Sequence, residues 1–66
     1  LFVFEENVKR FPNSANVYDS LGEAYEKNGQ REKAEASYAK SVEIAEKKKH
    51  PNLKIYQQNL ARVQEK

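Results

Sequence analysis

Apolar residues recur along this chain at steps of three and four residues, the spacing of one face of an α-helix. Four segments show this spacing, and breaks at 12–13, 28–29 and 50–52 separate them. No segment alternates with the period of two that marks a strand. Because the breaks are short, neighbouring helices are expected to run antiparallel. The pattern therefore predicts an all-α fold, an antiparallel array of about four helices.

The first two helices are separated at Pro12. Proline lacks a backbone N–H and disfavours helical geometry in the residue before it, so the first helix is expected to end there. Either Asn13 or Ser14 can cap the second helix by accepting a backbone N–H bond. The apolar stripes are Leu1, Phe4, Val8 and Phe11 in the first helix, and Val17, Leu21, Ala24 and Tyr25, with Tyr18 beside them, in the second.

The third helix is expected to begin near Arg31, because Gly29 readily takes the left-handed conformation found just past helix ends. Lys47, Lys48 and Lys49 fall in its last turn, where positive charge complements the helix dipole. The predicted buried face of the third helix is Ala34, Tyr38, Ser41, Val42 and Ala45, and the apolar side of the fourth is Leu53, Tyr56, Leu60 and Val63.

The sequence also repeats itself. Phe4 and Tyr38 lie 34 residues apart, and so do Val8 and Val42. Helix–turn–helix units with this period are typical of tetratricopeptide repeats, whose pattern sets an aromatic residue, Leu-Gly, Tyr, then Ala and a second aromatic at fixed intervals. The chain resembles this family most closely over residues 15 to 45. The residues that carry the resemblance are Tyr18, Leu21, Gly22, Tyr25, Ala34 and Tyr38.

Each of these signature residues has a packing role. Gly22 has no side chain and lets the two helices of a repeat approach closely. Ala34 is small where the partner helix crosses, and Tyr38 reaches into the next repeat. The space inside the helix pair is filled by Tyr18, Leu21 and Tyr25.

The resemblance divides the chain into three parts. Residues 1–12 are interpreted as the second helix of a truncated preceding repeat, 13–50 as a complete repeat, and 51–66 as a polar C-terminal capping helix. Glu46 stands where the family has proline, and Pro51 comes later, so the third helix is expected to be longer than usual. Gln64 stands where the pattern has Tyr, which favours a solvent-facing end.

Composition narrows the possible functions. The 66 residues make at most one small domain, and such a domain buries only about 60% of the surface that its unfolded chain exposes. A net charge of +2 is too small to predict nucleic-acid binding. No apolar run approaches the roughly 20 residues of a membrane-spanning helix. The chain has no methionine, so it is expected to be a piece of a larger protein.

Catalytic chemistry has little support in the sequence. A catalytic site needs a nucleophile or a tuned acid–base pair, and the serines have no histidine partner at a suitable position. His50 is the single histidine and there is no cysteine, so no convincing zinc ligand set exists. We therefore predict no catalytic, cofactor-binding or metal-binding residue, and the chain is not expected to be an enzyme.

The basic run from Lys47 to His50 allows two interpretations. It could contact phosphate or an acidic lipid surface, or it could be a solvated helix end. It lacks the interleaved aromatic residues of single-strand nucleic-acid binders. We favour the solvated helix end, and neither nucleic acid nor a membrane is an expected partner.

The resemblance implies a function in protein–protein interaction. Tetratricopeptide arrays bind proteins or peptides in a concave groove lined by the first helix of each repeat. Three of the implied groove residues are acidic, which favours a basic peptide, although a merely solvated helix face would have a similar composition. The implied groove positions are Asn16, Asp19, Glu23, Glu26 and Lys27.

The first helix lacks an antiparallel mate on one side, so it is expected to expose an apolar face. Leu1, Phe4 and Val8 are the candidate residues for self-association, which would give a homodimer of the isolated chain. The segment also resembles the tetratricopeptide tails of some bacterial secreted hydrolases. This resemblance implies an alternative function, a non-catalytic structural tail of a larger hydrolase.

Overall fold

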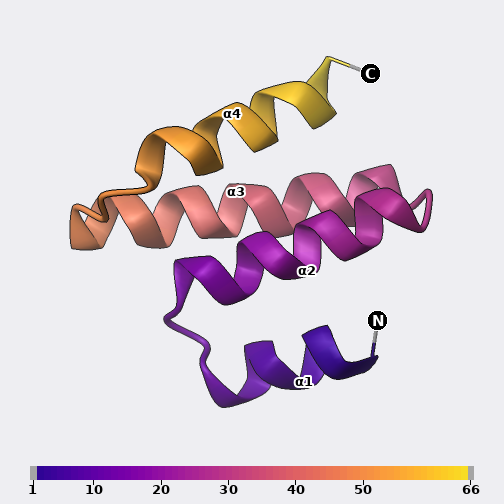
Figure 1. Ribbon diagram of the computed structural model, residues 1–66, viewed down its shortest axis with the longest axis horizontal. Coiled ribbons are helices and arrows are strands. Elements are labelled where there is room, and N and C mark those ends of the chain that lie inside the picture. The colour runs from indigo at the N-terminus through magenta and orange to yellow at the C-terminus, as the bar shows by residue number, and fades with distance from the viewer. Residues whose placement is uncertain (1, 66) are drawn as a thin grey trace.

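The computed structural model describes residues 2–65, which form four α-helices and no strand. The helices lie side by side in chain order and each runs antiparallel to the one before, so α1 and α4 occupy opposite edges of the array (Figure 1). The predicted all-α helical array is confirmed. The helices are α1 (Phe2–Arg10), α2 (Ala15–Lys27), α3 (Arg31–Lys48) and α4 (Leu53–Gln64).

Local sequence accounts for the helix boundaries. Ser14, not Asn13, caps α2, because its Oγ accepts a hydrogen bond of 3.3 Å from the backbone N–H of Val17. Gly29 follows α2 with a φ of 78°, in the left-handed region that glycine enters without a steric penalty. Lys49 ends α3 in the same region with a φ of 52°. The left-handed conformations of Gly29 and Lys49 end their helices and let the chain reverse, so the next helix packs on the previous one.

Two buried clusters hold the array together, and each joins α2, α3 and α4. Both clusters include residues of α3, the central and longest helix, so the other helices pack mainly against α3. The first contains Leu21, Tyr25, Ala34, Tyr38 and Val63, with Val8 and Leu60 packed against it. The second contains Ala15, Ile44, Ala45 and Tyr56, with Tyr18, Val42 and Leu53 packed against it.

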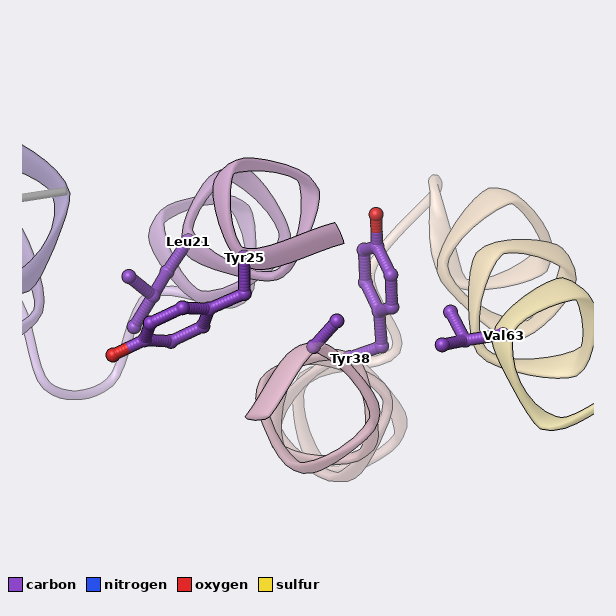
Figure 2. Close-up of a cluster of buried hydrophobic side chains, with 5 residues drawn as sticks. Leu21, Tyr25, Tyr38 and Val63 are labelled. Carbon is purple, nitrogen blue, oxygen red and sulfur yellow. The ribbon is translucent and has the colours of Figure 1, made fainter. Parts of the chain in front are cut away.

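Gly22 of α2 lies against the Tyr38 ring of α3. A Cβ atom placed on Gly22 would lie 2.7 Å from Cδ1 of Tyr38, closer than any ordinary contact. The Tyr38 side chain is 1% exposed, and Figure 2 shows its ring standing on α3 between α2 and Val63 of α4. The missing side chain of Gly22 thus makes room for the Tyr38 ring.

The apolar stripe predicted for the first helix is wrong at Phe11. α1 ends at Arg10, and Phe11 is 57% exposed. The physical reason is Pro12, which disfavours helical geometry in the residue before it. Val8 is half-buried because it packs on the first cluster. Leu1 lies outside the described residues.

Candidate functional site

The helices α2 and α4 lie on either side of α3 and share one face of the molecule (Figure 2). Residues at steps of three and four lie on one side of a helix. On α2 the side that faces α4 is marked by Asp19 and Glu26, both of which contact α4. We call this surface the α2–α4 face and define it by Asn16, Asp19, Glu23, Glu26, Ile55, Asn59 and Arg62.

One link across the α2–α4 face joins Asp19 to Asn59. Nδ2 of Asn59 donates a hydrogen bond of 2.9 Å to Oδ1 of Asp19. Burial raises the pKa of the Asp19 carboxyl, although the hydrogen bond from Asn59 acts to lower that pKa. Both side chains are half-buried, so this link lies partly beneath the surface of the α2–α4 face.

The second link is a bidentate ion pair between Arg62 and Glu26. Nη2 of Arg62 lies 2.6 Å from Oε1 of Glu26, and Nε lies 3.1 Å from Oε2. Such paired bonds fix both partners in orientation as well as distance. The bonds to Glu26 raise the pKa of Arg62. The side chain of Glu26 is 19% exposed and that of Arg62 48%, so the pair is open to solvent mainly on the arginine side.

Tyr38 brings α3 into the same network. Its hydroxyl donates a hydrogen bond of 2.8 Å to Oε1 of Glu26, and Cζ of Arg62 lies 6.0 Å from the centre of its ring. Burial, followed by the hydrogen bond to the Glu26 carboxylate, raises the pKa of Tyr38. One carboxylate on α2 therefore binds a side chain from α3 and another from α4.

Three residues of the α2–α4 face take no part in these links between helices. Asn16 and Glu23 are exposed, and Ile55 is 52% exposed. Glu23 forms a surface ion pair of 3.3 Å with Lys27, a type of pair that contributes little stability. The face thus offers an amide, an exposed carboxylate and one apolar side chain around a fixed polar centre.

The five residues implied by the family resemblance divide into two groups. Asp19 and Glu26 hold α4 in place, whereas Asn16, Glu23 and Lys27 are exposed. The residues of α4 were missed, although the sequence carried a signal for two of them. Aligning Leu60-Ala61 on Leu21-Gly22 puts Ile55 and Arg62 at the positions of Asn16 and Glu23.

The described residues contain neither a metal-ligand cluster nor a membrane-spanning helix. No group of three or more His, Cys, Asp or Glu among residues 2–65 could hold a metal ion. Within the same range, no helix has both the length and the apolar character that crossing a membrane requires.

Comparison with known families agrees with this architecture. The family model of the tetratricopeptide repeat matches residues 12–66, from the turn before α2 to the end of the chain. The chain belongs to the tetratricopeptide repeat family. Tetratricopeptide repeats generally mediate protein–protein interaction, bind proteins or peptides, and are generally non-catalytic. No curated protein and no solved structure is significantly similar to this chain.

Proposed function

We propose that this tetratricopeptide repeat chain is a non-catalytic scaffold that binds a segment of another protein along the α2–α4 face. The observation that carries the proposal is the network of Glu26, Arg62 and Tyr38, which fixes α2 and α4 relative to each other. A surface that is rigid before binding loses less conformational entropy when a ligand binds. The fixed polar centre leaves the exposed Asn16, Glu23 and Ile55 available to a ligand.

The charge of the α2–α4 face bears on the partner. Asp19, Glu23 and Glu26 are acidic, and two cations, Lys27 and Arg62, pair with two of them. The preference for a basic ligand thus stays a prediction. The two cations make the net negative charge of the face smaller than the three acidic residues alone would give. Ile55 adds an apolar contact, so the proposed ligand is a segment that carries both basic and apolar side chains.

A short labelled peptide of alternating lysine and leucine tests this proposal. We expect it to bind in a fluorescence anisotropy titration, and we expect Glu23→Lys to weaken binding about tenfold because the peptide then meets a like charge. Glu32→Lys is the matched control, since it makes the same charge change at an exposed position at the start of α3. Equal weakening by both variants, or no binding, would contradict the α2–α4 face as the site.

A second candidate function, self-association, is favoured by the exposed apolar residues of α1. The side chains of Phe2, Val3 and Phe4 are 72%, 65% and 37% exposed, and α1 contains no buried residue. Adjacent apolar side chains of this kind mark interaction surfaces. A second copy that packs its own α1 against this surface would cover both apolar faces at once.

We expect Phe4→Asp to convert a dimer of the 66-residue chain into a monomer, because the carboxylate would have to be buried at the interface. Light scattering over a concentration series measures the mass. Phe11→Asp makes the same change at an exposed phenylalanine beyond the end of α1, and it should leave the mass unchanged. A wild-type monomer, or dissociation by both variants, would count against self-association through α1.

The same face of α1 supports the alternative that the chain is a structural tail of a hydrolase. In that arrangement α1 would pack on a catalytic domain instead of on a second copy. A Ser-x-x-Lys or Gly-x-Ser-x-Gly motif in the sequence preceding Leu1 of a longer protein would favour this alternative.

A further inference from the structure

The turns that join α1 to α2 and α3 to α4 lie at the same end of the helices (Figure 1). Nζ of Lys48, at the end of α3, donates a hydrogen bond to the backbone carbonyl of Asn13 in the first turn. A pocket of about 320 Å³ lies at this junction, and we call it the turn pocket. It is lined by Arg10, Phe11, Pro12, Asn13, Ser14 and Lys48.

Positive charge gathers around the turn pocket. The ion pairs among residues 2–65 use Lys9, Lys27, Lys40 and Arg62, and none of them involves a cation that lines the pocket. Lys48 donates its hydrogen bond to a neutral carbonyl and not to a carboxylate. The cations in or next to the two turns without an ion pair are Arg10, Lys47, Lys48, Lys49 and Lys54.

Helix dipoles explain part of this charge but not the whole pocket. Arg10, Lys47 and Lys48 lie in the last turns of α1 and α3, where cations are favourable. The interaction of these cations with the helix dipoles does not explain why an aromatic side chain lies beside them. Phe11 is nevertheless 57% exposed and lines the pocket next to Arg10. Aromatic residues, phenylalanine among them, and arginine are both enriched in protein–protein interfaces.

We propose that the turn pocket binds an acidic peptide segment that carries an apolar side chain. Carboxylates of the segment would meet Arg10 and Lys48, and arginine forms strong paired hydrogen bonds with carboxylates. The apolar side chain would cover Phe11 and Pro12. Nucleic acid fits this site less well, because single strands require several stacking aromatic rings and Phe11 is the single aromatic residue that lines the pocket.

The turn pocket and the α2–α4 face share no residue. The proposed ligands also have opposite charge, since the α2–α4 face favours basic segments and the turn pocket favours acidic ones. Binding at the turn pocket therefore does not depend on the function proposed above. The chain could hold two different segments at once, which is how a scaffold joins two partners.

The test is a fluorescence anisotropy titration of the whole chain with a short labelled peptide of aspartate and glutamate around one leucine. We expect saturable binding that Arg10→Glu weakens about tenfold by charge reversal. Phe11→Ala changes no charge and is expected to weaken binding about fivefold by removing the apolar contact. Lys33→Glu, which reverses an exposed cation near the opposite end of α3, should change the affinity less than about twofold.

Three results would overturn the proposal. The first is the absence of saturable binding. The second is equal weakening by Arg10→Glu and Lys33→Glu together with no effect of Phe11→Ala, because this result means general attraction between opposite charges. The third is a tighter complex with a single-stranded oligonucleotide or with phosphatidylserine vesicles that depends on Arg10 and Phe11, since it would assign the pocket to a different class of ligand.

Discussion

Tyr38→Ala is expected to lower the free energy of unfolding by about 3–5 kcal/mol, the usual loss when a buried aromatic ring is removed. The Tyr38 side chain is 1% exposed and belongs to the same buried cluster as Leu21, Tyr25 and Val63. A chain of this size has a total stability of roughly 3–10 kcal/mol. The loss is therefore a large fraction of the whole stability, and we expect the midpoint of unfolding of this variant to fall sharply.

Tyr38→Phe is the matched control, because it keeps the ring and removes the hydroxyl that binds Glu26. It should cost about 1.5 kcal/mol, the lower end for a hydrogen bond to a charged group, because Arg62 still pairs with Glu26. Urea denaturation followed by circular dichroism at the helical wavelengths measures both variants. If Tyr38→Ala were as stable as Tyr38→Phe, the ring would not be the centre of the packing between α2, α3 and α4.

The four helices could be predicted from the sequence because their signals are local. The apolar steps depend only on the helical period, and the breaks depend on the chemistry of a few residues such as Pro12 and Gly29. The prediction was wrong where two local signals met. Phe11 continues the apolar spacing of the first helix, but the proline that follows ends the helix at Arg10.

The candidate site was predicted only on its α2 side. The family resemblance implied Asp19 and Glu26, and both lie on the α2–α4 face. Their partners Asn59 and Arg62 are 40 and 36 residues away along the chain. Such contacts depend on how α2 and α4 lie against α3, which the helical period does not specify. The pairing could therefore be seen only in the structure.

The turn pocket shows the same limit in another form. The sequence shows the basic run from Lys47 to His50, which we interpreted as a solvated helix end. It does not show that Lys48 reaches Asn13, or that Phe11 lies beside the same cluster of charge. The antiparallel packing of the helices brings the two turns to the same end of the array. Part of the basic run therefore lines the turn pocket.

Gly22→Val is expected to lower the free energy of unfolding by about 3 kcal/mol, at the upper end of the usual cost of overpacking. The first added carbon alone would lie 2.7 Å from Cδ1 and 2.8 Å from Cε1 of Tyr38, and the branched methyl groups need further space. Tyr38 is fixed by its cluster and by Glu26, so its ring cannot rotate away without losing those contacts.

A competing effect must be separated from this steric cost. Glycine is a poor helix former, and replacing it inside α2 gains up to about 1 kcal/mol from helix propensity. Glu23→Val introduces the same β-branched residue at the next position of α2, which is exposed, and it should cost only about 0.5 kcal/mol. The midpoint of urea denaturation at unchanged slope compares the two variants. A similar midpoint for both would mean that α2 and α3 can separate at Gly22 at little cost, and that close approach at this glycine is not what holds the helix pair together.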